Sequence, residues 1–487
     1  MTVRLSQLVS RAVTQNPVIT GVTADSRKVR PGFLFAALPG SKVDGRGYVD
    51  GAVAAGAAAI LAPDDVSHDG VPVVHVEDLR RAYALAASVF WGAQPATCVA
   101  VTGTNGKTSV ATFCRQIFAR LGRKAASMGT LGVTVSAPGV PDIQITPPGL
   151  TTPDAADVAE LMAKLAADGV THVALEASSH GIDQRRLDGV TLKAAAFLNL
   201  TQDHLDYHGT MGVYRAAKLR LFDTLLPAGG TAVLNADSDQ VEAFRSVAAG
   251  TGHTVLMTGE AGLDLHLIAR ELTADGQRLS VGFGGKTFDI HLPLAGAFQA
   301  DNALVAAGLC IAAGEAPVAV FAALEHLNGA PGRLQHIGSG PRGGEAYVDY
   351  AHTPDGLETV LKAMRPHTTG RLIVVFGAGG DRDRGKRPLM GAIAARLADV
   401  AIVTDDNPRS EAPAAIRADI LAAAPGAREV GDRREAIRAG VAVLGEGDVL
   451  VVAGKGHEQG QMIAGVNHPF DDVTETALAL GLEPAHG

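Results

Sequence analysis

A glycine-rich segment, VTGTNGKTS at residues 101–109, carries the residue types that bind the phosphates of a nucleotide. It follows an apolar run and precedes a stretch with helical spacing, so the chain turns there from a strand into a helix. Backbone N–H groups of such a turn cradle phosphates, Lys107 can reach the β- and γ-phosphates, and the Thr108 hydroxyl can ligate Mg²⁺. The general pattern has glycine where this chain has Val101, so the match is to a narrower form, G-T-N-G-K-T. The segment predicts nucleotide binding, against the alternative of a plain strand–turn–helix.

Glu176 adds a candidate metal ligand to this loop. It follows the apolar run THVAL, and the carboxyl end of that strand is expected to lie beside the phosphate loop. A carboxylate in that position suits Mg²⁺, as in other phosphate-loop enzymes. The alternative is a solvated loop glutamate. The chain has no clear N/T-K-x-D motif for reading guanine, which favours ATP over GTP.

Lys218 lies in YRAAKLRLF, where the spacing of the apolar residues predicts a helix that half-buries the ammonium. A bare ammonium close to Mg²⁺ would be repelled by the metal ion. The alternative is an ordinary lysine on a helix surface.

The elements that position these residues alternate between strand and helix. Apolar runs of strand length alternate with alanine-rich helical stretches, which is typical of α/β layers, and 487 residues suggest about three domains. Breaks near GAQPAT and NGAPGRLQ divide the chain into residues 1–95, 96–330 and 331–487. We expect an α/β fold with a mostly parallel central sheet and a Rossmann-like last domain. Within the first block, FLFAAL and VPVVHV predict strands and AVAAGAAA at residues 52–59 predicts a helix.

Composition excludes several classes of protein. The 42 Lys+Arg against 51 Asp+Glu give a net charge of -9 without a basic run, which argues against a general nucleic-acid binder. Cys98, Cys114 and Cys310 fit neither a disulfide framework nor a zinc site and indicate reduced core thiols. The N-terminal segment has no apolar signal region, and no segment predicts a membrane helix. We expect a cytoplasmic monomer with no nucleic-acid or membrane partner.

Several motifs together resemble one family. GTNGKTS, EASSHG, NLTQDHLDYHG, the AAK that ends at Lys218, and DNALVAAG look like the Mur ligases, ATP-dependent amide-forming enzymes of peptidoglycan precursor synthesis. The resemblance covers all three blocks in order. DSRKVRPGFLFAALPG with DGRGYV resembles the uridine-nucleotide domain of the family. GDRDRGKRP, DNPR and GKGHE resemble the diaminopimelate-adding members.

The resemblance implies a two-step reaction. The D-glutamate γ-carboxylate of UDP-MurNAc-L-Ala-D-Glu attacks the γ-phosphate of ATP and forms an acyl phosphate and ADP. The amine of diaminopimelate then attacks the activated carbonyl, and phosphate leaves. Metal ions and Lys107 offset the moving negative charge, and the domains exclude water from the intermediate. The implied substrates are ATP, the sugar nucleotide and diaminopimelate, and the implied cofactor is Mg²⁺.

The resemblance also assigns residues to the ATP side. Thr108 and Glu176 would hold Mg²⁺, and Lys218 would be carbamylated by CO₂ to an anion that helps hold a second Mg²⁺. His204 would contact the nucleotide, although its residue type also fits a general base; for His208 a structural turn and a functional role stay open. The implied nucleotide-binding residues are Gly103, Thr104, Asn105, Gly106, Lys107, Thr108, Ser109, Asn302, Arg333 and Asp349, with His352 nearby. An ordinary linker is the alternative for Arg333.

The sugar-nucleotide side has its own residue set by resemblance. The family often has Asn before its threonine pair, whereas this chain has Leu150, so that contact is not expected here. A short loop at residues 41–43 precedes DGR, and its backbone is expected to matter more than its side chains. The implied contacts are Ser26, Thr151, Thr152, Ser178, Gln184 and Arg186.

The DNPR motif predicts the choice of amine. Diaminopimelate carries a distal carboxylate that lysine lacks, and the planar fork of Arg409 suits that group. Pro408 restricts Asn407 to extended conformations and would stiffen the loop. Glu458 would pair with an ammonium. The implied set is Arg382, Asp406, Asn407, Pro408, Arg409, Gly454 and Glu458, against the alternative of a plain N-P turn with a solvated arginine.

Two other functions fit part of the sequence. A folylpolyglutamate synthetase shares the G-T-N-G-K-T loop, but the DSRKVRPG segment argues against it. A non-catalytic nucleotide-binding regulator of wall synthesis is disfavoured by the joint presence of Lys107, Glu176 and the C-terminal motifs.

Overall fold

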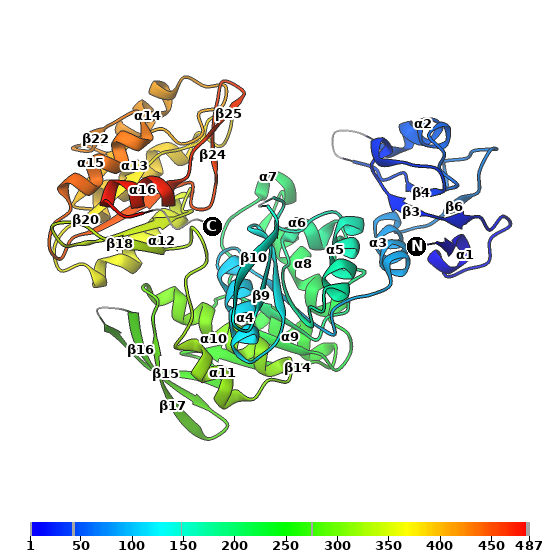
Figure 1. Ribbon diagram of the computed structural model, residues 1–487, viewed down its shortest axis with the longest axis horizontal. Helices are drawn as coiled ribbons and strands as arrows, with labels where there is room; N and C mark the ends of the chain where they lie inside the picture. Colours follow the sequence, from blue (N-terminus) through cyan, green and yellow to red (C-terminus); the bar gives the residue numbers. More distant parts are fainter. Residues whose placement is uncertain (1, 41–43, 148, 274–275, 484–487) are drawn as a thin grey trace. The chain divides into compact units, whose positions relative to one another are not determined.

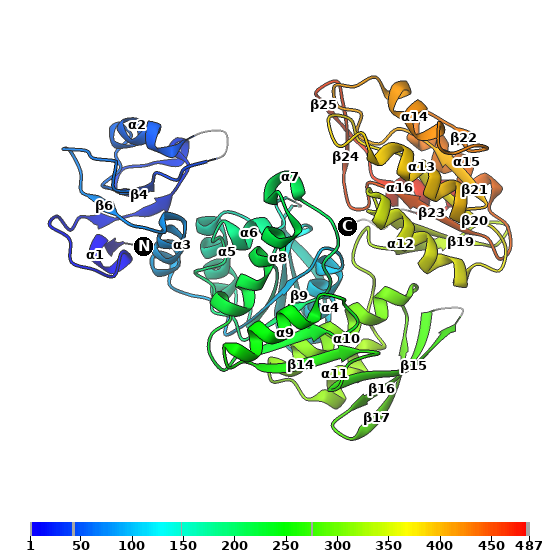
Figure 2. The same cartoon turned by 180° about the vertical axis from the view of Figure 1, so that it is seen from behind.

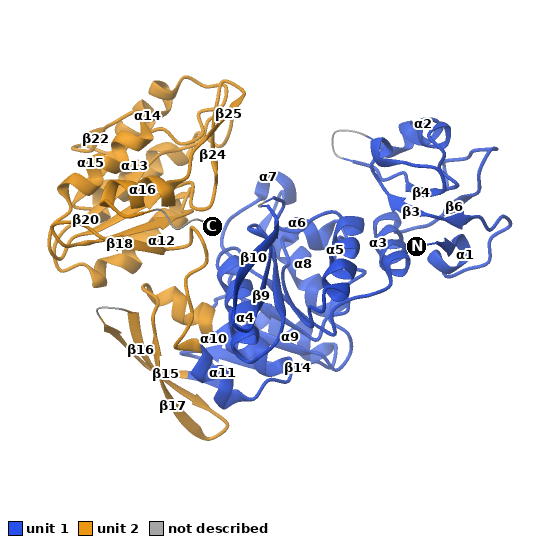
Figure 3. Ribbon diagram, viewed as in Figure 1, with its two compact units in different colours: residues 1–266, 304–323 blue, residues 267–303, 324–487 orange. Residues whose placement is uncertain are grey.

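The computed structural model describes residues 2–40, 44–147, 149–273 and 276–483. The chain forms two compact units, residues 1–266 with 304–323 and residues 267–303 with 324–487, called unit 1 and unit 2 below (Figure 3). The predicted loop at 41–43 lies outside the described residues. The predicted domain borders near residues 95 and 330 do not coincide with those of the two units and stay a prediction.

The first block of unit 1 contains a parallel sheet in the order β3-β4-β5-β6. Helix α3 buries Tyr83 and Phe90 against one face of this sheet, and α2 packs on the other. The bounds are β1 Val3–Arg4, α1 Leu5–Leu8, β2 Val18–Ile19, β3 Gly21–Thr23, β4 Phe33–Ala36, α2 Val49–Ala54, β5 Ala59–Ala62, β6 Val73–His75 and α3 Leu79–Trp91.

The prediction of a helix over residues 52–59 is wrong for residues 55–59. Helix α2 ends at Ala54, and Ala59 begins strand β5. Gly56 breaks the helix because its φ of 101° lies in the left-handed region, and a Cβ there would lie 2.9 Å from the Cα of Pro31. The predicted strands FLFAAL and VPVVHV are confirmed as β4 and β6.

The main sheet of unit 1 is largely parallel, as predicted. Its order is β10-β9-β8-β11-β7-β12-β13-β14; the six strands from β8 to β14 are parallel, and β9 and β10 are added antiparallel. The strand bounds are β7 Thr97–Thr102, β8 Ala125–Gly129, β9 Gly132–Ala137, β10 Val140–Thr146, β11 His172–Glu176, β12 Ala194–Phe197, β13 Thr231–Asn235 and β14 Thr254–Gly259.

Helices cover both faces of this sheet (Figures 1 and 2). Residues of α5, α8 and α9 share one core with alternate strand residues such as Ala100, Leu175 and Phe197, and α4 packs on the other face. The helix bounds are α4 Lys107–Arg120, α5 Ala155–Ala167, α6 Ser179–Asp183, α7 Leu205–His208, α8 Met211–Arg220 with a following π turn at Leu221–Leu225, and α9 Val241–Gly250.

Three elements have residues in both units: β15 Leu265–Thr273, α10 Ala297–Ala312 and α11 Pro317–Leu324. Unit 2 also contains an antiparallel hairpin of β16 Gly276–Phe283 and β17 Lys286–Leu292. Among the described residues, no helix combines the length and hydrophobicity needed to cross a membrane.

The C-terminal sheet of unit 2 has the order β18-β19-β23-β20-β21-β22 and is parallel except for β18. In β20, Leu372 and Val374 face a core with α12, α13 and α14, whereas Ile373 and Val375 face α15 and α16. Both faces are therefore covered, as in a Rossmann-like domain. The bounds are β18 Gln335–Ser339, β19 Glu345–Asp349, α12 Pro354–Met364, β20 Leu372–Phe376, α13 Lys386–Leu397, β21 Val400–Val403, α14 Pro413–Leu421, β22 Arg428–Glu429, α15 Arg433–Val443, β23 Val449–Ala453, β24 Gly460–Ile463, β25 Val466–Pro469 and α16 Asp472–Leu480.

A buried ion pair joins α15 to α16 in unit 2. The side chains of Arg433 and Asp472 are both 0% exposed, and their Nη2 and Oδ2 atoms lie 2.6 Å apart. Arg433 also donates to the carbonyl of Ala453, at the end of β23, at 3.0 Å. Burial raises the pKa of Asp472, and the neighbouring Arg433 opposes that rise. This pair fixes the end of a central strand.

We predict that Asp472→Asn destabilises unit 2 by about 3–5 kcal/mol, because it leaves a buried guanidinium without its counterion. Arg438→Gln, which removes a pair whose side chains are both 57% exposed, should cost about 1 kcal/mol or less. Hydrogen exchange of the β20 and β23 amides under increasing urea measures both effects. Equal losses in the two variants would contradict the prediction.

Candidate active site

The phosphate loop is held in shape by its own lysine and by a neighbouring strand end. Gly106, with φ of 91°, precedes α4, and Lys107 Nζ donates to the carbonyls of Gly103 and Thr104 at 2.8 Å each. Asn199 braces the loop from beyond β12, because its Oδ1 accepts from the backbone N–H of Asn105 at 2.9 Å. Sequence reasoning assigned no role to Asn199, although it directly follows a strand in the quoted NLT segment.

Glu176 is buried at the end of β11 with a shell of donors. The Thr108 hydroxyl donates to its Oε2 at 3.0 Å, and the backbone and hydroxyl of Thr130 donate to its two oxygens at 2.9 and 3.2 Å. A Cβ at Gly129 would lie 2.0 Å from Glu176 Oε1, so only glycine fits there. The predicted neighbourhood of Thr108 and Glu176 is confirmed, and the alternative of a solvated glutamate is wrong.

Lys218 lies on α8, as predicted, but its ammonium is fully buried rather than half-buried. Its Nζ donates to the Gly103 carbonyl at 2.7 Å and lies 4.6 Å from the ring centre of Tyr214. Burial lowers the pKa of Lys218 well below its ordinary value, and the charge of Lys107 lowers it further. The alternative of a surface lysine is wrong, because the helix turns Lys218 onto the phosphate loop.

The threonine pair connects Glu176 to the predicted peptide contacts. Thr151 Oγ1 lies 2.9 Å from Thr130 Oγ1, and Thr152 Oγ1 donates to the Glu176 carbonyl at 2.9 Å. Thr152 Oγ1 also lies 3.0 Å from the hydroxyl of Ser178, which caps α6. Unit 1 therefore brings these side chains together.

Arg186 and Gln184 extend this arrangement. Arg186 donates to the Thr152 carbonyl at 2.6 Å and to Gln184 Oε1 at 2.7 Å. Burial lowers the pKa of Arg186. Since the guanidinium is held between two fixed acceptors, its remaining face is oriented for an anionic group.

His204 and His208 belong to an aromatic cluster with His180. The ring of His180 lies 4.7 Å from that of His204 and 5.4 Å from that of His208, and burial with both neighbouring imidazoles lowers the pKa of His180 to about 4. His208 Nε2 lies 3.0 Å from the Ser179 hydroxyl and is buried, which favours the structural role for His208. His204 directly precedes α7, as its N-cap residue, with a left-handed φ of 52°.

Ser26 lines a cavity of about 970 Å³ in unit 1, together with Tyr48, Tyr83 and Asp154. The Tyr83 hydroxyl accepts from the Ala24 backbone at 3.2 Å and donates to Asp154 Oδ1 at 2.7 Å. Tyr83 therefore connects the Ser26 loop to the start of α5. A cavity of this size suits a ligand such as a nucleotide.

Unit 2 holds the predicted hinge residues. The Arg333 guanidinium lies 4.3 Å from the ring centre of Tyr350, and its predicted contact with the nucleotide stays a prediction. Asp349 Oδ2 accepts from the Leu334 backbone at 2.6 Å, and burial raises the pKa of this carboxyl. Burial lowers the pKa of His352. Asn302 Nδ2 donates to Gln299 Oε1 at 3.2 Å.

The DNPR residues form a second polar site in unit 2, beside the hairpin of β24 and β25. Arg409 has a left-handed φ of 52°; its backbone N–H donates to the Met462 carbonyl at 2.9 Å and its Nη1 donates to the Gly380 carbonyl at 2.8 Å. Asn407 Nδ2 donates to Glu458 Oε2 at 2.8 Å. The structure thus brings Asp406, Asn407, Pro408, Arg409, Gly454 and Glu458 together, while Arg382 is exposed on the neighbouring loop. The alternative of a plain turn with a solvated arginine is wrong.

Three family descriptions of known proteins match successive parts of this chain. The description "Mur ligase family, catalytic domain" matches residues 18–91, "Mur ligase middle domain" matches 101–310, and "Mur ligase, glutamate ligase domain" matches 332–456. The chain belongs to the Mur ligase family. The predicted family and its three-domain α/β fold are confirmed.

Individual relatives within the family share a single printed name. A protein of Caulobacter vibrioides named UDP-N-acetylmuramoyl-L-alanyl-D-glutamate--2,6-diaminopimelate ligase is 71% identical over 481 residues, 99% of each chain. One of Rhizobium meliloti with the same name is 54% identical over 95% of this chain and 94% of its own. A solved structure with that name is 33% identical, has a TM-score of 0.74 and covers 99% of both chains. Folylpolyglutamate synthase of Mycobacterium tuberculosis, complexed with ADP, shares the fold at 19% identity, a TM-score of 0.64 and 77% of this chain.

We predict that Lys218→Met stabilises unit 1 at neutral pH and that this gain shrinks as the pH rises toward 10.5. The folded state binds fewer protons than the unfolded state between the lowered pKa of Lys218 and its ordinary value, so wild-type stability rises across that window. Midpoints of thermal unfolding in CO₂-free buffer, compared with wild type at each pH, measure the gain. Lys164→Met, which removes a 60% exposed lysine, serves as the control. A gain that is constant with pH would contradict the prediction.

Proposed function

We propose that this chain is an ATP-dependent ligase that joins diaminopimelate to the D-glutamate γ-carboxylate of UDP-MurNAc-L-Ala-D-Glu. The observation that carries the proposal is the joint presence of two sites. Lys107, Thr108 and Glu176 lie together at the phosphate loop, where they could hold phosphate and a metal ion, and Asn407, Arg409 and Glu458 offer groups for both a carboxylate and an ammonium. Relatives with this printed activity match almost the whole chain. The pathway also supports a cytoplasmic location, and we propose a monomer.

The first step makes an acyl phosphate. A γ-carboxylate oxygen bonds to the γ-phosphorus of ATP, and the bond to the bridging oxygen breaks, which releases ADP. Backbone N–H groups of residues 103–109 and the Lys107 ammonium stabilise the charge on the phosphate oxygens. Arg186 and the Thr151–Thr152 pair orient the peptide carboxylate.

The second step forms the amide. The neutral amine of diaminopimelate attacks the acyl carbon, the tetrahedral intermediate collapses, and phosphate leaves with its bonding electron pair while the amine loses a proton. The Arg409 site holds the remote end of the amino acid, so the amine is presented in one orientation. Arg333, Asn302 and Asp349 are proposed to contact the nucleotide.

Thr108 and Glu176 fit Mg²⁺, because hydroxyl and carboxylate oxygens are the ligands that this ion prefers. When bound, Mg²⁺ neutralises phosphate charge during transfer. In the described residues, Glu176 is oriented by Thr130 as well as by Thr108, so its carboxylate is fixed before any ion binds.

Lys218 fits the proposed carbamate. Its lowered pKa favours the neutral amine, which is the form that bonds to the carbon of CO₂ and then loses a proton. The product is an anion in place of the amine, which would make the electrostatic field beside the phosphate loop more negative. His204 is proposed as a nearby nucleotide contact.

Two alternatives remain testable. Folylpolyglutamate synthesis would require a folate substrate, whereas the cavity that includes Ser26 and Tyr48 favours a uridine nucleotide. A non-catalytic regulator would bind nucleotide without turnover. Phosphate release with UDP-MurNAc-dipeptide, tested with a panel of amino acids and against folate, separates all three functions.

We predict that the enzyme prefers diaminopimelate to L-lysine by at least ~100-fold in kcat/KM, about the ~3 kcal/mol of one charge-assisted contact. Arg409→Ala should remove most of this preference and leave the KM for ATP nearly unchanged, because lysine has no distal carboxylate to lose. Arg396→Ala, at an exposed pair, is the matched control. Equal use of lysine by the wild type would rule out this assignment of Arg409.

We predict that Lys218→Ala is nearly inactive and that millimolar acetate or formate partly restores phosphate release, since a small carboxylate can replace the lost anion. Wild type and Lys164→Ala should not respond to the added acids. Mass spectrometry of the wild type under ¹³CO₂, after trapping of the carbamate, tests the modification directly. Failure of rescue together with an unlabelled lysine would refute the carbamate.

A further inference from the structure

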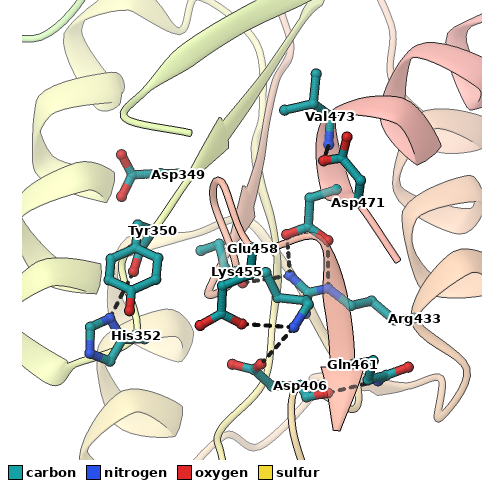
Figure 4. A network of polar contacts seen from close by, with 12 residues as sticks. Asp349, Tyr350, His352, Asp406, Arg433, Lys455, Glu458, Gln461, Asp471 and Val473 are labelled. Atoms are coloured by element: carbon teal, nitrogen blue, oxygen red, sulfur yellow. Dashed lines mark hydrogen bonds and ion pairs between the residues drawn. The ribbon is translucent and has the colours of Figure 1, made fainter. Parts of the chain in front are cut away.

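Lys455 is a buried cation at the centre of the DNPR site (Figure 4). It lies two residues beyond the end of β23, and its side chain is 0% exposed. Its Nζ donates to Glu458 Oε2 at 2.9 Å and to Asn407 Oδ1 at 3.2 Å, and lies 3.7 Å from Asp406 Oδ1. One ammonium therefore contacts three of the residues proposed to hold diaminopimelate.

The contacts of Asn407 close this arrangement into a ring. Its Oδ1 accepts from Lys455 and from the Met462 backbone at 2.9 Å, while its Nδ2 donates to Glu458 Oε2 at 2.8 Å. Both ends of the amide are engaged, so its orientation is determined. Glu458 Oε2 accepts from both Lys455 and Asn407, and the Glu458 side chain is still 33% exposed. Glu458 is therefore fixed at one oxygen and accessible to a ligand.

The Asp406 carboxylate is buried and, within the described part of the chain, lacks a hydrogen-bond donor at one oxygen, so it requires a nearby cation. Its side chain is 6% exposed, and its buried Oδ1 has no hydrogen-bond partner among the described residues. Carboxylate oxygens of Asp406 and Glu458 lie 3.7 and 2.9 Å from Lys455 Nζ, and the two carboxylates would repel each other unless a positive charge lay between them. Lys455 occupies that position.

The backbone of Lys455 is anchored as well. Arg433 binds the carbonyl of Ala453 at 3.0 Å, and Gly454 adopts a φ of 125°, with its Cβ position 3.1 Å from Asp406 Oδ2. The backbone at residues 453–454 is therefore held in place, and this fixes the position from which the Lys455 side chain extends.

We propose that Lys455 is a positioning residue for amine specificity: it holds Asp406, Asn407 and Glu458 so that the two carboxylates face the distal ammonium of diaminopimelate. This inference rests on the proposed function. Lys455 acts through its neighbours, so its loss should weaken recognition of the ammonium and leave recognition of the distal carboxylate by Arg409 intact. A lysine with a purely structural role would affect both equally.

The test compares diaminopimelate with 2-aminopimelate, which keeps both carboxylates and one amine but lacks the distal ammonium. For Lys455→Met we expect the KM for diaminopimelate to rise about tenfold or more, with kcat and the KM values for ATP and the sugar nucleotide within about twofold. The inhibition constant of 2-aminopimelate should stay within about twofold of the wild-type value. Lys362→Met, at a 60% exposed lysine of unit 2, controls for removal of a positive charge.

Lys455→Arg keeps the charge and should restore most of the affinity for diaminopimelate. If Lys455→Met does not fold, as judged by its thermal unfolding, Lys455→Arg and Lys455→Gln are compared instead, and only the neutral variant should show the selective loss. An unchanged KM for diaminopimelate, or equal losses for both compounds, would overturn the inference. A wild-type enzyme that does not use diaminopimelate would instead reject the proposed function.

Discussion

The ATP site depends on one buried contact, that of the Lys218 ammonium with the carbonyl of Gly103. Lys107 donates to the same carbonyl, so two cationic side chains meet at a single backbone oxygen. Two ammonium groups so close together repel each other, and burial together with the charge of Lys107 lowers the pKa of Lys218 well below its ordinary value. The contacts of both lysines with the Gly103 carbonyl therefore help to hold the loop in its observed shape.

Unit 2 stabilises its buried charges by ion pairs instead. Arg433 cannot lose its proton, so it requires the equally buried carboxylate of Asp472, and together they hold the end of β23. Lys455, directly beyond that strand, is surrounded by the acceptors of Asn407 and Glu458. Removing either cation would leave buried carboxylates without a positively charged partner, so both cations are needed to keep this site folded.

The sequence predicted the parts of the fold and site that depend on local patterns. The phosphate loop and the strand that ends at Glu176 each follow from residues adjacent in the chain. The error at residues 52–59 arose because alanine favours helix wherever it occurs, whereas Gly56 and the close approach of Pro31 decided the outcome. Thr130, Asn199 and Lys455 were missed because their partners lie 46, 94 and 48 residues away, a separation that no local pattern encodes. The full burial of Lys218 has the same origin, since Gly103 lies 115 residues before it.

In the proposed function, specificity for the amine would follow from rigidity more than from the number of contacts. Arg409 adopts a left-handed backbone conformation that costs a non-glycine residue of the order of 1 kcal/mol or more, and it is held there by pairing with the β24–β25 hairpin. Asn407, Lys455 and Glu458 are joined in a closed ring. A distal carboxylate and a distal ammonium would thus meet groups that are already oriented, so little ordering is needed on binding. An amino acid that lacks either group would leave a buried charge unmatched, and that penalty, rather than any loss of shape complementarity, would exclude it.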